Sequence, residues 1–498
     1  MACGAVSSFG LGASEEYFRA GSLIGSGPVR LVKTGADGAE RWVDGMHINR
    51  PDDLCDIANL GLTMAEGKLV LAGLQREFVA GQTRDHAVVY RPDCRICGVA
   101  CRVKDDHVHR IATLFGSVAV RLPRFCRGKC GGTEAGNQWP SHCRSTPELD
   151  WLQAHLPALM PYREAVDVPA QRLPLDAGKG CETLRRHTLK IGKSLRHEVV
   201  SRSETEASAI DTSLAATFIR SCKDGERHLQ VIVGNVETGA DGRQVFGAVA
   251  TSGTDIKEQI RGNLDAVGRT ADTALTAFID GCSGRDLPKV PSSEAGWNGK
   301  ARVRRILADA GVAALPILDW FHIAMRLQHL KQVAGGPSAD DPDQTAAKAV
   351  IVAEVERLHW RLWNGKAQDA QISIDRISAV THHFQGETDG RSAVVSSKKL
   401  WTGLHALDDY LTGQSDRMVN YAERHRAGLR VGTAVIEGPA NFLVNRRMEK
   451  SPSMRWPRRG ADLLLQVRCA GCNGTLGSGF GQRFHPANDQ HPQEAIAA

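Results

Sequence analysis

Apolar residues at helical spacing predict one amphipathic helix near the start of the chain, over residues 63–84. Its apolar positions are Leu69, Leu71, Leu74 and Phe78. Short strand-like runs follow in residues 91–133, and the pattern becomes helical again over residues 145–200. This second helical zone begins at Thr146-Pro147, where a capping residue precedes a proline in the first turn.

From Ala209 onward, strands and helices alternate, which is typical of an α/β domain. Apolar runs predict strands at residues 209–221, 228–239, 244–254, 274–284 and 313–322. Helical patterns predict helices at residues 255–268 and 321–334, between or directly after these strands. A mainly helical stretch then follows, and a last helix begins within residues 432–448, with Pro439 in its first turn.

Composition narrows the class of protein. The chain has 498 residues, a net charge of +6 and no apolar run of the roughly 20 residues that cross a bilayer. Its N-terminus lacks the basic and apolar regions of a signal peptide, so we expect a cytoplasmic protein with no membrane partner. Thirteen cysteines in a chain of this length indicate metal binding rather than a disulfide framework.

Three acidic residues stand where an α/β fold can present them together. Asp211 follows a short apolar pair, Asp280 ends a strand before Gly281, and Glu437 stands at the entry to a helix. Phosphodiester chemistry uses two divalent ions about 3.5–4 Å apart, and Mg²⁺ prefers carboxylate ligands. The three acids therefore predict a site for two Mg²⁺ or Mn²⁺ ions.

The segments around these acids resemble bacterial insertion-sequence transposases of the ISKra type. The resemblance covers roughly residues 63–475 and is carried by residues 274–288, 317–330 and 436–468. Its most specific motifs are Val444-Asn445, Arg447-Met448, Met454-Arg455-Trp456 and Arg459-Gly460-Ala461. It implies a DDE enzyme with an RNase H-like core, in which Asp211, Asp280 and Glu437 bind the metal ions.

Two positions depart from the family pattern, and one acid competes with the assignment. Gly-Pro-Ala-Asn follows Glu437 where the family has Ser and later Val, and Cys-Ser-Gly follows Asp280-Gly281 where the family often has Gly-Asp. Asp319 also ends an apolar strand and competes with Asp280 for the second acid. His322 follows in the next helix, as a supporting or packing residue.

Two close cysteine pairs predict a structural zinc site. Cys94 and Cys97 are separated by two residues, and Cys126 and Cys130 by three. Four thiolates from two turns form the tetrahedral cage that Zn²⁺ prefers, and the strand-like residues between the pairs suit a zinc ribbon. Alternative ligands are Cys101, His107, His109 and Cys143. Cys469 and Cys472 have the same spacing but no partner pair, so we interpret them as incidental.

Two basic segments predict contact with double-stranded DNA. Arg185, Arg186 and Lys190 lie in the last helix of a region that resembles a helix-turn-helix. The second segment follows Glu437 and surrounds an aromatic residue, a pattern that suits phosphate contact and base stacking. Its candidate DNA-binding residues are Arg446, Arg447, Arg455, Trp456, Arg458 and Arg459.

The fold class predicted from these features is α/β, an RNase H-like catalytic core with a helical insertion, preceded by a zinc-ribbon-like module and a helix-turn-helix-like domain. The predicted parts are an N-terminal region (1–62), an amphipathic helix (63–90), the zinc module (91–144), a helical DNA-binding domain (145–203), the first part of the catalytic domain (204–335), the insertion (336–430), the end of the catalytic domain (431–473) and a disordered tail (474–498).

The predicted function is transposition, and two alternatives remain open. The resemblance implies a bacterial, nucleoid-associated protein that binds element ends and target DNA as a homo-oligomer. The first alternative is an RNase H-like nuclease that cuts without joining. The second is a DNA-binding protein derived from a transposase whose acidic site is inactive.

Overall fold

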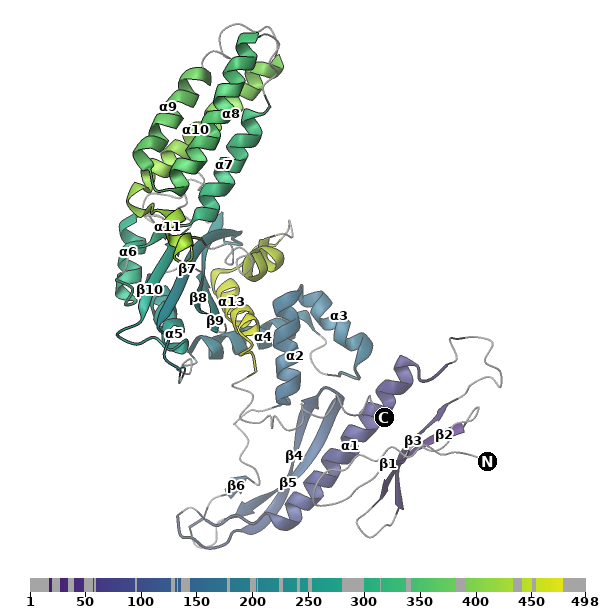
Figure 1. Ribbon diagram of the computed structural model, residues 1–498. Helices are drawn as coiled ribbons and strands as arrows, with labels where there is room; N and C mark the ends of the chain where they lie inside the picture. The colour runs from purple at the N-terminus through teal and green to yellow at the C-terminus, as the bar shows by residue number, and fades with distance from the viewer. Residues whose placement is uncertain are drawn as a thin grey trace. The chain divides into compact units, whose positions relative to one another are not determined.

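A computed structural model defines two compact units of the chain (Figure 1). One comprises residues 1–190 and 476–498, the other residues 191–475. The structure describes residues 18–19, 27–34, 40–48, 57, 60–94, 96–126, 130–131, 133–135, 144–176, 180–197, 203, 205–223, 227–239, 242–249, 253–279, 300–313, 315–336, 342–381, 391–432, 441–449 and 454–477. The predicted disordered tail therefore lies almost entirely outside the described residues.

The first unit begins with a small antiparallel sheet that the sequence did not predict. Its strands, in the order β1-β2-β3, are β1 (Phe18–Arg19), β2 (Gly27–Thr34) and β3 (Glu40–Ile48). Helix α1 (Met64–Val89) follows, and the predicted amphipathic helix is confirmed. Thr63 begins it with a capping box: its hydroxyl accepts from the Glu66 backbone N–H, and the Glu66 carboxylate accepts from the Thr63 N–H.

The apolar stripe predicted for α1 is wrong in detail. Leu69 and Phe78 are 63% and 40% exposed, whereas Val79 packs against the next sheet. That sheet has the order β4-β5-β6, and α1 lies against β5. Its antiparallel strands are β4 (Arg102–Thr113), β5 (Gly116–Cys126) and β6 (Thr133–Ala135). Helical spacing alone predicted a buried face of α1 that is too wide. Only the part of that face that contacts the sheet is buried.

Three helices follow where the sequence predicted a helical region. They are α2 (Pro147–Leu159), α3 (Tyr162–Arg172) and α4 (Cys181–His197). Within the first unit, α4 is joined to α2: the Thr188 hydroxyl donates to the Gln153 carbonyl, and His187 Nε2 lies 3.1 Å from Asp150 Oδ1. The boundary between the two units falls inside α4.

The second unit contains a five-stranded mixed sheet with the order β11-β10-β7-β8-β9. Its strands are β7 (Ala209–Arg220), β8 (His228–Thr238), β9 (Gly242–Val249), β10 (Ala274–Ile279) and β11 (Ile317–Leu318). β7, β8 and β9 pair antiparallel, whereas β10 runs parallel to β7, and β11 runs parallel to β10. The predicted strands are confirmed, although β11 is much shorter than expected.

Both faces of this sheet are covered by helices. Helix α5 (Gly253–Ala266) leads from β9 to β10, and α6 (Lys300–Asp309) precedes β11. Their apolar residues share one core with Ile210, Leu214 and Ile279 of the sheet. Side chains alternate between the two faces of a strand, so Ala215 and Ile219 lie on the opposite face, where they pack with the C-terminal segments.

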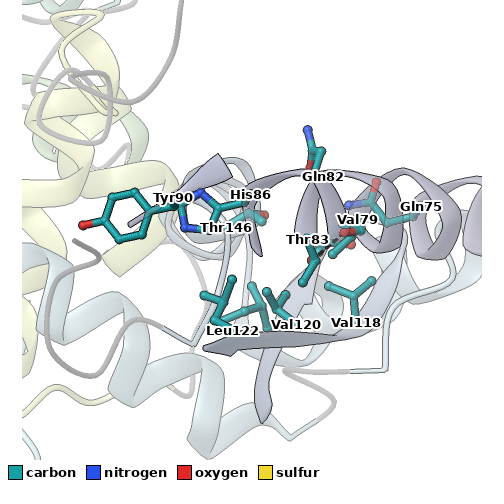
Figure 2. Close-up of a pocket in the computed structure, with 12 residues that line it drawn as sticks. Gln75, Val79, Gln82, Thr83, His86, Tyr90, Val118, Val120, Leu122 and Thr146 are labelled. Atoms are coloured by element: carbon teal, nitrogen blue, oxygen red, sulfur yellow. Dashed lines mark hydrogen bonds between the residues drawn. The ribbon is translucent and has the colours of Figure 1, made fainter. Parts of the chain in front are cut away.

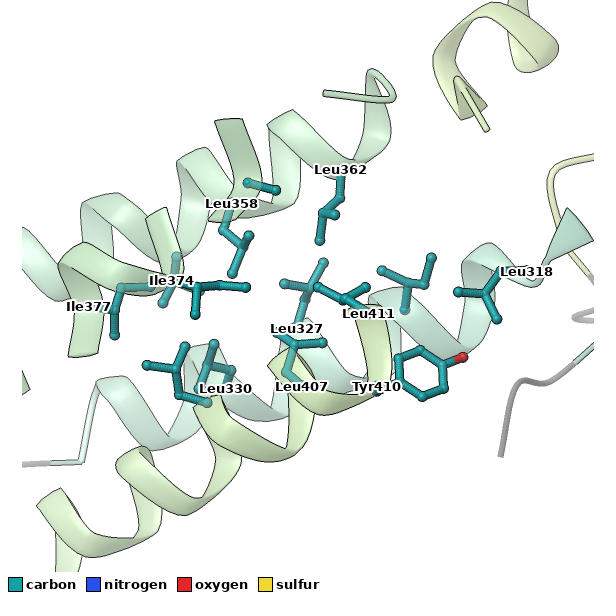
Figure 3. Close-up of a cluster of buried hydrophobic side chains, with 14 of the residues drawn as sticks. Leu318, Leu327, Leu330, Leu358, Leu362, Ile374, Ile377, Leu407, Tyr410 and Leu411 are labelled. Atoms are coloured by element: carbon teal, nitrogen blue, oxygen red, sulfur yellow. The ribbon is translucent and has the colours of Figure 1, made fainter. Parts of the chain in front are cut away.

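The residues predicted as a helical insertion, 336–430, form one bundle with the preceding helix α7, which follows β11 (Figure 1). Its members are α7 (Trp320–Ala334), α8 (Pro342–Trp363), α9 (Ala367–Thr381) and α10 (Arg391–Gly413), then the short helices η3 (Ser415–Arg417) and α11 (Tyr421–Arg426). Figure 3 shows its core, where Leu327, Leu358 and Leu407 point toward one another from α7, α8 and α10.

Two C-terminal segments close the second unit. η4 (Asn441–Glu449) is π-helical, and α13 (Arg458–Cys472) follows it. α13 packs on β9 and approaches α4 so closely that a Cβ at Gly192 would lie 2.2 Å from the Leu463 carbonyl oxygen. Only glycine fits this crossing. Cys469 is buried in α13, in agreement with the interpretation that its pair with Cys472 is incidental.

Candidate functional site

Asp211 lies in a row of polar side chains that crosses three neighbouring strands. The register pairs Asp211 with Glu237 of β8 and with Thr276 of β10. Paired residues on adjacent strands share a face, so the two carboxylates stand side by side. Their side chains are 27% (Asp211) and 14% (Glu237) exposed, which leaves little water to screen their repulsion. A cation is therefore required at this position.

Arg430 supplies that positive charge. Its Nε lies 3.4 Å from Asp211 Oδ2, and its Nη1 donates to the Glu237 carboxylate. Arg424 supports this arrangement, because its Nε donates to the Arg430 carbonyl oxygen at 3.0 Å. The sequence analysis missed both Glu237 and Arg430. Counting residues outward from the turn between β7 and β8 would have placed Glu237 opposite Asp211. No local sequence signal identifies Arg430.

Burial raises the pKa of Asp211 above its ordinary value, and the Arg430 guanidinium and a hydrogen bond with Thr276 reverse this effect only in part. The folded chain therefore holds a proton on Asp211 more tightly than the unfolded chain does. Ionised Asp211 therefore lowers the stability of the fold. This loss of stability is complete at pH values above the raised pKa, and it is absent below the ordinary Asp pKa of about 3.9. Raised pKa values of this kind are common among active-site acids.

Asp211→Asn should therefore stabilise the second unit at neutral pH. The expected gain is within the ~0.5–2 kcal/mol of typical stabilising substitutions, and it should shrink as the pH falls. Thermal unfolding of both proteins from pH 7 to pH 4 measures it. Asp272→Asn, at an exposed acid just before β10, is the matched control and should change little. A loss of stability for Asp211→Asn at pH 7 would contradict this reading.

Asp280 and Glu437, the other two predicted acids, lie outside the described residues, as does Pro439. The register of β10 nevertheless sets a condition on the triad. Asp211 pairs with Thr276, whereas Ile279, the residue before Asp280, pairs with Leu214. Three residues of a strand span about 10 Å. Metal sharing by Asp211 and Asp280 therefore depends on the course of the chain after Ile279, which lies outside the described residues.

Asp319, the competing acid, has a structural task. It is fully buried and caps α7, because its Oδ1 accepts from the Phe321 backbone N–H at 2.8 Å. Its own N–H donates to the Ile279 carbonyl, and His322 Nε2 lies 3.8 Å from its Oδ2. A buried acid whose oxygen caps a helix is a poor metal ligand, which argues against Asp319 as the second acid. Asp280 stays a prediction.

The segment that follows Glu437 is fixed by a buried arginine. Arg468 of α13 is 2% exposed, and its Nε donates to the Leu443 carbonyl of η4 at 2.6 Å. Burial lowers the pKa of Arg468 to about 10. Leu443 and Val444 are fully buried in the same core as Ile219 of β7. η4 is thus held against the central strand, a few residues after the position of Glu437.

Three of the four predicted zinc ligands lie together. The ligand sulfurs of Cys94, Cys97 and Cys130 are all within 4.8 Å of one another, and among the described residues no other group of three or more potential ligands is this close. Sulfurs bound to one tetrahedral Zn²⁺ at about 2.3 Å stand roughly 3.8 Å apart. The cluster could therefore hold a metal ion such as zinc after a small adjustment.

The backbone around this cluster favours the Cys94 thiolate, whereas hydrogen bonding with Cys97 raises the pKa of Cys130 to about 11. Backbone N–H groups of Cys97 and Ile96 donate to the Cys94 sulfur and lower its pKa. Gly98 and Gly131, each directly after a ligand cysteine, have φ of +65°, which L-residues rarely adopt. The Gly98 N–H returns to the Cys94 carbonyl at 2.9 Å. Each glycine thus allows the tight turn that presents a cysteine.

The fourth predicted ligand, Cys126, is not part of the cluster. It ends β5, and its Sγ donates to the Arg102 carbonyl at 3.4 Å. Cys101, His107 and His109, the alternative ligands, are also outside the group of three, and the two histidine rings pack edge-to-face on β4. Cys143 lies outside the described residues. Cys126 stays the predicted fourth ligand.

The basic side chains of α4 differ in their exposure and in their contacts with Glu182. They belong to Arg185, Arg186 and Lys190. The Arg185 guanidinium donates to the Glu182 carboxylate at 2.8 Å, and its side chain is 39% exposed. The Arg186 side chain is 70% exposed, and its Nε is 3.9 Å from Glu182. Lys190 is also exposed. Arg186 and Lys190 therefore present charge from the surface of α4.

The structure corrects part of the second basic segment. Trp456 is only 8% exposed, and its Nε1 donates to the Met448 carbonyl at 3.0 Å, so its ring belongs to the core and does not stack on DNA bases. Arg447 is 3% exposed and lies over that ring, 5.2 Å from its centre. The neighbouring arginines are more accessible: Arg446, Arg455 and Arg459 are exposed, and Arg458 is half-buried.

A separate apolar pocket of about 740 Å³ lies between α1 and the β4–β5 sheet (Figure 2). Val118, Val120 and Leu122 form its floor, while Gln75 and Gln82 approach from α1. Its lining residues include no carboxylate or cysteine.

Comparison with models of known protein families and with curated proteins finds no match to this chain. In the part of the chain that the structure describes, no helix combines the length and apolarity of a membrane span.

Proposed function

We propose that the chain is a DNA transposase of the DDE type, which cleaves DNA strands at the ends of an insertion sequence and transfers them to a target. The observation that carries the proposal is the topology of the five-stranded sheet. Three antiparallel strands are followed by two parallel ones, and Asp211 lies on the central strand β7. This order is the one expected for an RNase H-like core.

In this proposal Asp211, Asp280 and Glu437 hold two Mg²⁺ or Mn²⁺ ions. The ions would supply an activated attacking oxygen and a stabilised leaving oxygen. The oxygen donors of Asp211 and Glu237 suit such hard cations, and the Arg430 guanidinium marks where positive charge belongs. Arg430, whose Nε lies 3.4 Å from Asp211 Oδ2, would compete with such an ion for this carboxylate.

The remaining parts of the chain take DNA-binding roles. The cysteine cluster and the β4–β5–β6 sheet form a zinc-ribbon-like module, and α2, α3 and α4 form the helix-turn-helix-like domain. Arg186 and Lys190 on one segment, and Arg446, Arg455 and Arg459 on the other, are exposed cations that suit phosphate contacts. The protein would act as a homo-oligomer on double-stranded DNA in the bacterial nucleoid.

Two observations favour a second candidate, a transposase-derived DNA-binding protein that no longer cuts. Arg430 already neutralises Asp211 and Glu237, and the β10 register carries the chain past Asp211 before it reaches Asp280. A site that has exchanged its metal for an arginine would have these two features. It would still bind DNA through the same basic segments.

A cleavage assay separates the candidates. The substrate is DNA that carries the two sequences flanking the gene, which should contain inverted repeats, and the protein is added with Mg²⁺ or with EDTA. A transposase yields cuts at the repeats and joined products, whereas a plain nuclease yields cuts without joining. Binding with no cutting in the presence of Mg²⁺ would support the second candidate and overturn the proposal.

A further inference from the structure

Helices α7 and α10 of the bundle enclose a groove of about 990 Å³ that none of the assignments above uses. Met325 and Val333 of α7 and Leu407 of α10 form apolar parts of its wall. Gly403 and Ala406 form part of the wall on the α10 side, where their small size leaves the space open. A Cβ at Gly403 would reach only ordinary contact with Leu330, at 3.8 Å.

The basic side chains of Arg326, Lys398 and Lys399 line the groove, together with His322 and His329. No carboxylate is among the lining residues in the described part of the bundle. The exposed Lys398 and Lys399 therefore give the groove positive charge.

The geometry presents this charge as two facing rows. His322, Arg326 and His329 are spaced by four and three residues, so they lie on one face of α7. Arg326 stacks over the Tyr410 ring at 4.3 Å, which holds its guanidinium beside the groove. Lys398, Lys399 and Thr402 stand opposite on α10 and are exposed. Such rows match the repeated charges of a nucleic-acid backbone.

The groove begins beside the proposed catalytic edge. His322 lies in the first turn of α7, three residues after Asp319. The Asp319 backbone N–H donates to the carbonyl of Ile279, the residue before Asp280, at 3.0 Å. DNA that extends from the proposed catalytic acids along this edge of the sheet would therefore contact α7 first, at His322 and Arg326.

We propose that this groove binds the sugar–phosphate backbone of duplex DNA beside the cleavage site, with Lys398, Lys399 and Arg326 as the phosphate contacts. The inference rests on the proposed function for the identity of the polyanion. Apolar walls suit the sugar edges between phosphates, and the contacts position DNA without reading its sequence.

Lys398→Gln/Lys399→Gln is the direct test, because both lysines are exposed and their loss should not disturb folding. Each lost phosphate contact reduces the slope of log K against log salt by about 0.9, so the double variant should lose about 1.8. Binding at 0.1 M salt should weaken roughly 10- to 100-fold. Thr402→Glu, which adds a carboxylate at an exposed position, should weaken it as well. A fluorescent duplex titrated at several KCl concentrations measures both.

Lys331→Gln/Lys366→Gln is the matched control, since it removes two exposed lysines of the same bundle outside the groove. It should leave the slope unchanged. An equal loss in both double variants, or no loss in either, would overturn the groove assignment even in a protein that cleaves DNA. A loss of DNA binding in the groove variant alone would support the groove assignment. If the wild-type protein also binds DNA but never cuts it, the catalytic proposal would be overturned. Absence of any DNA binding by the wild type would overturn both.

Discussion

Replacing Asp211 with alanine should abolish metal-dependent strand cleavage and leave DNA binding close to that of the wild type. Asp211 lies on the central strand of the sheet, where its carboxylate would hold an ion against the scissile phosphate. Loss of a single stabilising donor lowers catalytic rates by about 10²–10³, and loss of a metal ligand should cost at least as much. Cleavage of the flanking-repeat DNA, with binding measured in parallel, tests this.

The controls separate catalysis from folding. Asp272→Ala removes an exposed acid just before β10 and should retain full activity. Glu237→Ala should reduce cleavage less than Asp211→Ala, because Glu237 flanks the proposed triad. Wild-type cleavage rates in Asp211→Ala would show that the metal site lies elsewhere or that the acid has only a structural role.

The second large effect concerns the cysteine cluster. We expect one zinc ion per chain, and Cys94→Ser should remove it and unfold the module around β4 and β5. Structural zinc contributes about 10–16 kcal/mol of binding free energy in small zinc-finger peptides, far more than the stability of so small a module. Elemental analysis gives the zinc content, and circular dichroism with a chelator reports the loss of structure.

Two further cysteine variants make the zinc prediction specific. Cys181→Ser changes an exposed cysteine of α4 that lies outside the cluster and should keep the zinc. Cys126→Ser should lose it if Cys126 rotates to become the fourth ligand, and keep it if another group or water completes the site. Protein purified without chelators that contains no zinc would remove the metal assignment altogether.

The sequence predicted the core of the second unit well, for reasons that are local. Strands β7, β8 and β10 are buried and rich in β-branched residues, so their patterns are unambiguous. β11 is shorter than predicted, because Asp319 ends it to cap α7. The N-terminal sheet was not foreseen, although β2 and β3 contain the strand-favouring residues Val29, Val32, Trp42 and Val43.

The candidate site was less accessible from the sequence. Glu237 became visible only through the register of β7 with β8, and Arg430 reaches Asp211 from a segment more than two hundred residues away. The prediction for Trp456 was wrong, because its arginine neighbours suggested an exposed aromatic ring. Tertiary packing buries the ring, and its N–H donates to the Met448 carbonyl. Cysteine spacing identified three clustered ligands, but not which way the Cys126 sulfur points.

The most direct test of the account is a crystal structure of the protein with Mn²⁺, read by anomalous scattering. The account predicts two Mn²⁺ peaks about 3.5–4 Å apart, bound by Asp211, Asp280 and Glu437, with Arg430 displaced from Asp211. Crystals grown at millimolar Mn²⁺ that show no peak at Asp211, with Arg430 still between Asp211 and Glu237, would contradict it.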